Sequence, residues 1–229
     1  MTTVLLVRHG LTDANTGGTL AGWTPGVHLA AKGTEQVQAL ATRLATVPLT
    51  AIVSSPLERC QETAAALAAG RSGLDVTTDD RLGECRYGDW QGQPLKTLAK
   101  DPLWKVVQTH PSAVTFPGGE SLRETQSRAV AAVRDHNTRL GPDATWVAVS
   151  HGDVIKAILA DALGVHLDGF QRITVDPASV SIVTYTELRP FVVRMNDIGG
   201  DLTGLIRPAR KRRKRTSDAA VGGGAGGGS

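Results

Sequence analysis

The chain has 229 residues, of which 41% are apolar and 21% are charged. This length and apolar content suffice for one sizeable hydrophobic core and do not require a second domain. No run approaches the roughly 18 to 20 apolar residues of a membrane-spanning helix. The first apolar run, residues 4–7, follows Met1 without the basic region of a signal peptide. We therefore expect a soluble, cytoplasmic protein with reduced cysteines and no membrane partner.

The formal net charge of +3 is unevenly distributed. Residues 207–215 contain seven lysines and arginines, and Asp218 is the one acidic residue among the last 23, so residues 1–206 carry a net charge of −3. Residues 222–229 are glycine, alanine and serine, which provide no apolar side chains for a core. The sequence predicts one folded domain over residues 1–206 and a disordered, basic and glycine-rich tail over residues 207–229.

In the first half of the chain, short apolar runs alternate with segments of helical period. Strands are predicted over residues 4–7, 51–53 and 75–78. The apolar residues of segment 34–47 recur at intervals of three and four, which predicts a helix with one buried stripe. After the second strand, Ser55, Pro56 and Glu58 have the order of a capping serine, a first-turn proline and a capping-box glutamate, which predicts that a helix starts there.

In the middle of the chain, four prolines between residues 94 and 117 predict short helical pieces. Ser121 and Glu124 repeat the capping-box pattern, which predicts a helix to about Leu140.

The last third predicts a third buried strand over residues 145–149 and a helix over 153–163 that ends at Gly164. Residues 180–185 and 191–195 are predicted to pair as a hairpin. The expected fold class is α/β, with a mostly parallel sheet between helices.

Chemistry-bearing residues follow three of the predicted strands. Arg8 and His9 end the first strand, Arg59 lies one helical turn after the second, and His151 follows the third. Ligands of open α/β sheets bind beyond the carboxyl ends of the strands, so we expect these four side chains to meet there. Each alone would be an ordinary loop or surface residue, and their convergence carries the functional argument.

Two arginines and two histidines together indicate phosphoryl chemistry. Guanidinium groups present paired donors that match phosphate oxygens and neutralise a dianion. Flanking cations favour the neutral form of histidine, whose ordinary pKa is about 6.5, so the arginines would help His9 to act as a nucleophile.

The segment around His9 resembles the Arg-His-Gly signature of the histidine phosphatase superfamily, in the branch that includes cofactor-dependent phosphoglycerate mutases. Further similar segments occur in the family's order, from residue 4 to about residue 160, and as a set they are highly specific. This resemblance implies a phosphoglycerate mutase-like three-layer α/β/α sandwich. The segments are residues 6–15 (LVRHGLTDAN), 54–64 (SSPLERCQETA), 82–84 (LGE), 88–92 (GDWQG), 117–121 (PGGES) and 150–152 (SHG).

The resemblance assigns a role to each matching position. His9 corresponds to the nucleophile that carries the phosphoryl group as phosphohistidine. Glu84 corresponds to a general acid at the mouth of the pocket, which protonates the leaving oxygen and later takes a proton from water. Matches to positions that bind the phosphoryl group or lie beside the substrate are Arg8, Arg59, His151, Asn15 and Thr12.

No metal and no cofactor are expected, because the sequence has no ligand cluster of the usual spacings and no phosphate loop ending in Gly-Lys-Ser/Thr. The expected substrate is a small phosphorylated sugar, sugar acid or alcohol, and the resemblance makes a homodimer possible. Candidates for the pocket mouth are Trp23, Trp90, Trp104, Lys105 and His110.

Hydrolysis and transfer to a substrate hydroxyl use the same motif residues. His151 lies 67 positions after Glu84, which is short beside true phosphoglycerate mutases, whose insertion there helps to enclose a bisphosphorylated sugar acid. The chain therefore resembles a metal-independent phosphatase, with a phosphoglycerate mutase-type phosphomutase as the alternative. Actinobacterial relatives of this kind are often described as probable phosphomutases, and the Ala/Arg/Gly-rich composition is compatible with such a source.

Three further interpretations stay open. A non-catalytic binding protein on the same fold is the alternative from another class. The basic run 207–215 would attract nucleic acid or another polyanion, although a solvated tail is the preferred interpretation and nucleic-acid binding is not expected. Cys60 and Cys85 flank expected site residues, which suggests a redox switch; we favour buried, unbridged thiols, because Cys60 lies on an apolar helix face.

Overall fold

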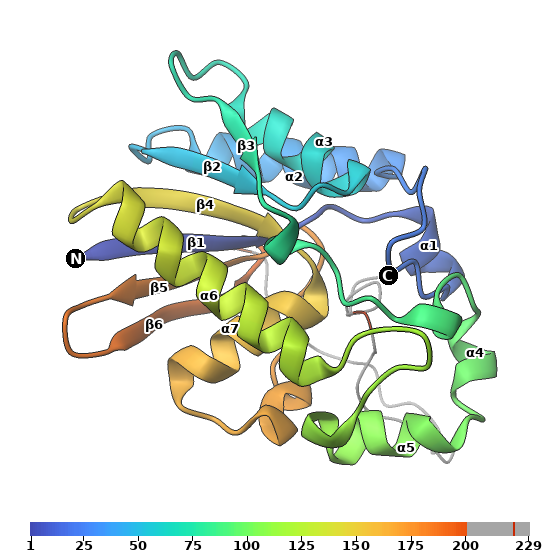
Figure 1. Ribbon diagram of the computed structural model, residues 1–229. Coiled ribbons are helices and arrows are strands. Elements are labelled where there is room, and N and C mark those ends of the chain that lie inside the picture. The colour runs from blue at the N-terminus through green and yellow to red at the C-terminus, as the bar shows by residue number, and fades with distance from the viewer. Residues whose placement is uncertain (201–221, 223–229) are drawn as a thin grey trace.

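The computed structural model describes residues 1–200 and Gly222. Within this part of the chain, one sheet has the strand order β3-β2-β4-β1-β5-β6 (Figure 1). The first four strands pair in parallel, whereas β5 is antiparallel to β1 and β6 is antiparallel to β5. These pairings confirm the predicted mostly parallel sheet and the late hairpin. The strands are β1 (Thr2–Arg8), β2 (Ala51–Ser54), β3 (Val76–Thr78), β4 (Thr145–Ser150), β5 (Val180–Tyr185) and β6 (Pro190–Asp197).

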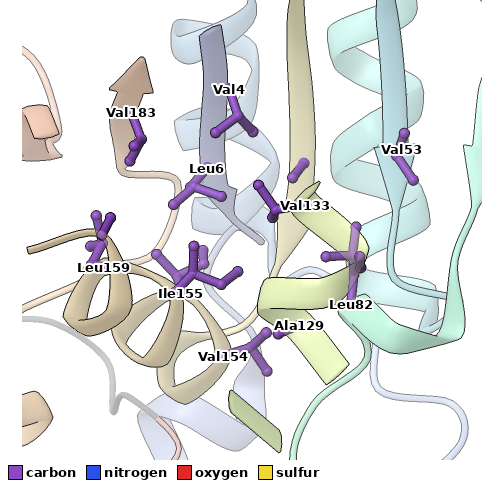
Figure 2. Packing of buried hydrophobic residues seen from close by; sticks show 14 of the residues in the cluster. Val4, Leu6, Val53, Leu82, Ala129, Val133, Val154, Ile155, Leu159 and Val183 are labelled. Atoms are coloured by element: carbon purple, nitrogen blue, oxygen red, sulfur yellow. The ribbon is translucent and has the colours of Figure 1, made fainter. Parts of the chain in front are cut away.

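Helices form two layers, one on each face of the sheet (Figure 1). The apolar stripes of α2 and α3 pack on one face, and α6 and α7 pack on the other around Trp146. Figure 2 shows this second contact, where Ile155 and Leu159 of α7 lie against Leu6 of β1. The α-helices are α1 (Asp13–Gly17), α2 (Ala31–Leu44), α3 (Glu58–Ala68), α4 (Leu95–Leu98), α5 (Pro102–Thr109), α6 (Leu122–Leu140) and α7 (Gly152–Leu163). The 3₁₀ helices are η1 (Asp80–Leu82), η2 (Gly88–Trp90), η3 (Pro111–Ala113) and η4 (Leu167–Arg172).

The parallel register places three strand ends side by side. Arg8 at the end of β1 lies opposite Ser150 at the end of β4, and Ser54 at the end of β2 lies opposite Val149. The loops that leave β1 and β2 therefore each start about 5 Å from the end of β4, which lies between them. The fold thus brings together Arg8 and Ser150, which are 142 positions apart in the chain.

Helix ends follow local chemistry at some sites and tertiary contacts at others. Ser121 and Glu124 form the predicted capping box of α6, and Gly164 ends α7 in the left-handed conformation. The predicted cap at Ser55 is wrong: α3 begins at Glu58 after Leu57, which makes no side-chain cap. The Ser55 hydroxyl instead accepts from the Leu57 amide at 3.3 Å and contacts His151.

Most of the predicted tail, 207–229, lies outside the described residues, so its disorder and its charge-driven binding stay predictions. Gly222 is the described residue of that segment. In the described part of the chain, no helix is long and apolar enough to cross a bilayer.

Gly33→Ala tests a close approach on which the loop after His9 depends. A Cβ at Gly33 would lie 2.0 Å from the Leu11 carbonyl oxygen, and backbone cannot yield there as a flexible side chain would. We expect the free energy of unfolding to fall by about 1–3 kcal/mol, as for other overpacked sites, in urea denaturation followed by circular dichroism. Gly17→Ala is the matched control, because its Cβ would meet nothing within 4 Å; equal stability of the two variants would contradict this reading.

Thiol titration tests the redox-switch idea. Both cysteines are free and fully buried, and burial raises the pKa of Cys60 to about 12 and that of Cys85 well above its usual value. The reactive thiolate is therefore scarce at neutral pH. We expect Ellman's reagent to detect no thiol in the folded protein and both in denaturant. Rapid labelling of the folded protein would favour the switch.

Candidate active site

The four residues predicted to converge lie together at the carboxyl ends of the strands. Arg8 ends β1, His9 follows it, Arg59 stands in the first turn of α3, and His151 precedes α7. All four side chains are buried, and the two imidazole rings have centroids 5.3 Å apart. The strand ends thus bring two cations and two imidazoles together at one site, as predicted.

His9 is held as a neutral imidazole with one nitrogen available. Its Nδ1 lies 2.7 Å from the Gly10 carbonyl, which can only accept, so we assign the proton to Nδ1 and the lone pair to Nε2. Burial lowers the pKa of His9 well below 6.5, and the positive charges of Arg59 and Arg8 lower it further. The ring is therefore unprotonated and nucleophilic at neutral pH.

His151 is fixed at both ring nitrogens. Its Nε2 lies 2.8 Å from Ser55 Oγ, and its Nδ1 lies 3.3 Å from Arg59 Nη2 and 3.9 Å from Glu84 Oε2. Burial lowers the pKa of His151, followed by the charges of Arg59 and of His9 when protonated. Sequence reasoning missed Ser55 because it matched a helix cap, although its place after β2 at the same sheet edge was the available signal.

The two guanidinium groups are buried cations, and each donates a hydrogen bond to a backbone carbonyl. Arg59 donates from Nη2 to the Gly22 carbonyl at 2.8 Å, and its buried Nη1 has no hydrogen-bond partner among the described residues. Arg8 donates from Nη1 to the Val175 carbonyl at 2.8 Å. Burial lowers the pKa of Arg8 to about 10, against the pull of Glu84, Asp153 and Asp176, so it stays charged at neutral pH. Buried cations of this kind favour an anionic ligand.

Glu84 lies inside the pocket and not at its mouth, with 3% of its surface exposed. Its Oε1 accepts from the Cys85 amide at 3.0 Å. Burial, assisted by the negative charge of Asp153, raises the pKa of Glu84 to about 7, while Arg59, the Cys85 amide and Arg8 oppose the shift. A carboxyl group in this environment carries a proton at near-neutral pH and can donate it.

Asp153 is a second buried carboxylate that sequence reasoning did not single out. It accepts from the Tyr87 hydroxyl at 2.9 Å and from the Gly222 amide at 2.9 Å, and Lys156 Nζ lies 3.4 Å away. The Gly222 carbonyl in turn lies 3.4 Å from Arg8 Nη2. In the sequence, the signal that could have identified Asp153 was its position two residues after His151.

The pocket opens beside His9, Arg59 and Glu84, and Arg8 and His151 are fully buried next to them. Thr12 and Asn15 line it too and form the capping box of α1, in which Asn15 Oδ1 accepts from the Thr12 amide and hydroxyl at 3.1 and 2.9 Å. The Asn15 amino group is therefore the part of that side chain that can donate to an anion. The other lining residues are Thr19, Leu20, Ala21, Gly22, Leu95 and Gly222.

The candidates for the pocket mouth are wrong. Trp90 and Trp104 are buried in an apolar cluster, with ring centroids 6.1 Å apart. Lys105 and His110 are exposed and do not line the pocket. Trp23 does not line the pocket either, but its indole donates to the Glu84 carbonyl at 2.6 Å and so supports the loop that carries Glu84.

Among the residues that the structure describes, no group of three or more His, Cys, Asp or Glu side chains is arranged to hold a metal ion. The donor set around His9 consists of guanidinium, imidazole and amide groups, which suit a phosphate oxygen. The arrangement can bind a tetrahedral dianion beside an unprotonated imidazole and a protonated carboxyl group.

The comparisons with known proteins agree with this geometry. The family model of the histidine phosphatase superfamily (branch 1) matches residues 4–198. Phosphoserine phosphatase 1 of Hydrogenobacter thermophilus is 31% identical over 199 residues, which cover 86% of this chain and 92% of the relative. A probable phosphoglycerate mutase of an Enterobacter species is 30% identical, over 91% of this chain and 97% of the relative.

A solved structure gives the same result. The mycobacterial glucosyl-3-phosphoglycerate phosphatase, solved in complex with VO3, superimposes with a TM-score of 0.76 at 29% identity, over 85% of this chain and 98% of that one. The family match covers residues 4–198, which contain all the helices listed above and all the strands apart from the first two residues of β1. The chain therefore belongs to branch 1 of the histidine phosphatase superfamily.

Proposed function

We propose that the chain is a metal-independent phosphatase that hydrolyses small phosphate monoesters through a phosphohistidine on His9, with Glu84 as general acid and base. One observation carries the proposal: the neutral His9 imidazole, with Nε2 unprotonated, lies in a pocket with the buried Arg59, whose Nη1 lacks a partner among the described residues. Phosphatase activity is also the function named for several relatives.

In the first step, Nε2 of His9 attacks phosphorus and the ester oxygen departs with the proton of Glu84. Arg8 and Arg59 offset the negative charge of the transferring group. His151, which contacts Arg59, supplies a further donor once the bound dianion raises its proton affinity. Asn15 and Thr12 lie on the pocket wall, where they contact the bound ester.

In the second step, water attacks phosphorus and the N–P bond breaks. Glu84, now a carboxylate, takes the proton of that water, and inorganic phosphate leaves. The raised pKa of Glu84 suits both directions of transfer, because a group that titrates near the working pH gives and takes protons with little cost.

The lining of the pocket favours hydrolysis over phosphoryl transfer between two substrate hydroxyls. A phosphomutase must also hold the second anionic group of a bisphosphate. In the described part of the chain, the lining residues beyond the phosphate site, among them Leu20, Ala21 and Leu95, include no cation. A small phosphorylated alcohol or sugar fits this lining best, and a mutase is the alternative that the assay below tests.

Phosphate release from a panel of esters tests the proposal. The panel contains p-nitrophenyl phosphate, phosphoserine, 3-phosphoglycerate and glucosyl-3-phosphoglycerate, each assayed with chelator present. We expect release that survives chelation and falls by at least about 10³-fold in His9→Ala, because the covalent step is lost. His110→Ala is the matched control, since this histidine is exposed and outside the pocket.

Quenching with a denaturant at alkaline pH during turnover adds a second readout, because the phosphoramidate bond of phosphohistidine hydrolyses in acid but persists in alkali. Absence of both release and label would favour the non-catalytic alternative. Conversion between 2- and 3-phosphoglycerate with a bisphosphate primer, in place of release, would favour the mutase.

The pH dependence of kcat/KM for an alkyl ester tests the acid role. Glu84 must be protonated in the first step, so its raised pKa predicts that kcat/KM falls as pH rises through about 7. His9 must be unprotonated, and its lowered pKa moves the acidic limb well below 6.5. After correction for ionisation of the ester, Glu84→Gln is expected to lose the alkaline limb. A limb unchanged in that variant would show that another group titrates.

A further inference from the structure

The backbone of Glu84 is fixed by a side chain from a different part of the chain. Arg128, in the middle of α6, donates from Nη1 to the carbonyl oxygens of Arg81 and Gly83 at 2.7 and 2.8 Å. It donates from Nη2 to the Glu84 carbonyl at 3.0 Å. One guanidinium group thus binds three carbonyl groups in the four residues that end at Glu84.

Arg128 is itself held by a carboxylate. Glu120 accepts from Nε at 3.0 Å and from Nη2 at 2.6 Å, in a two-point contact that fixes the guanidinium plane. The side chains of Arg128 and Glu120 are 20% and 13% exposed, so solvent competes little. Burial alone would raise the pKa of Glu120, but the hydrogen bonds and charge of Arg128 hold it below its usual value.

The same carboxylate also holds the other side of the loop. Glu120 Oε1 accepts from the Arg86 amide at 2.8 Å, and the Glu120 amide donates to the Arg86 carbonyl at 2.9 Å. The segment between Arg81 and Arg86 is therefore fixed at both ends by one ion pair. It contains no regular helix or strand beyond η1, so these contacts replace the hydrogen bonds that an element would supply.

A general acid depends on such support because its reach is short. With the backbone of Glu84 fixed, its carboxyl position depends only on side-chain rotations, and a displacement of about 1 Å at a catalytic group costs on the order of 100-fold in rate. Arg128 does not line the pocket, so it acts through the loop and not on the ester.

We propose that Arg128, oriented by Glu120, is the positioning residue of Glu84: its guanidinium group binds the loop carbonyls and sets the carboxyl group for proton transfer to the leaving oxygen. The proposal rests on the proposed function, because it takes Glu84 to be the general acid. It deepens that function by assigning the acid's placement to an ion pair outside the pocket.

Leaving-group dependence separates this role from a structural one. p-Nitrophenolate departs without a proton, whereas the alkoxide of phosphoserine requires one. The first irreversible step governs kcat/KM, which makes it the measured quantity. In Arg128→Gln we expect kcat/KM for phosphoserine, or for another alkyl ester that the wild type hydrolyses, to fall about 100-fold, and that for p-nitrophenyl phosphate to fall less than about fivefold.

Arg128→Lys keeps the charge but cannot reproduce the planar set of donors, so an intermediate loss on the alkyl ester is expected. Arg134→Gln is the matched control, because Arg134 lies on the same helix in an exposed pair with Asp161, and within residues 1–200 it makes no hydrogen bond to the segment 81–86. Thermal denaturation identifies variants that fail to fold, and Arg128→Lys then carries the test.

Glu84→Gln distinguishes the failure of this proposal from that of the proposed function. If Glu84→Gln shows the selective loss on the alkyl ester and the Arg128 variants lose both substrates equally or neither, the positioning role is overturned and the acid role stands. If Glu84→Gln itself loses both substrates equally or neither, Glu84 is not the acid, and both proposals fall together.

Discussion

The burial of Arg8 and Arg59 at the carboxyl ends of β1 and β2 is the constraint on which the rest of the site depends. Moving a guanidinium group out of water costs several kcal/mol unless acceptors replace the lost hydration. Backbone carbonyls of Val175 and Gly22 supply part of that replacement. Nη1 of Arg59 has no hydrogen-bond partner among the described residues, so an oxyanion in the pocket would replace the hydration that this atom loses.

The same electrostatics shifts the pKa values of His9 and Glu84 in opposite directions. Desolvation and the two cations lower the pKa of His9, and desolvation together with Asp153 raises the pKa of Glu84 to about 7. An unprotonated imidazole and a protonated carboxyl group can therefore coexist in one pocket at the same pH, because burial disfavours the charged form of each. Exposed to solvent, neither group would have its pKa displaced so far.

Contacts within and between the loops hold these side chains in position. α7 begins directly after His151, and the hydroxyl of Ser55 holds the ring from the neighbouring strand end. The loop with Glu84 has no ladder of its own and depends on Arg128, Glu120 and the Trp23 indole. The sheet edge thus positions the two arginines and two histidines, while side-chain contacts to an irregular loop position Glu84.

The sequence by itself determined the strands, the α6 capping box and the convergence of Arg8, His9, Arg59 and His151, because these depend on local periodicity and on the common edge of parallel strands. Only the tertiary structure decided that the Ser55 hydroxyl contacts the His151 ring and does not cap a helix, and that Glu84 is buried. Both depend on contacts between residues far apart in the chain, which no local pattern records. For the same reason the role of Arg128 could not be predicted, because its position in the helical pattern is that of an ordinary surface residue. The burial of Trp90 and Trp104 could not be predicted either, because their cluster forms only when the loops pack.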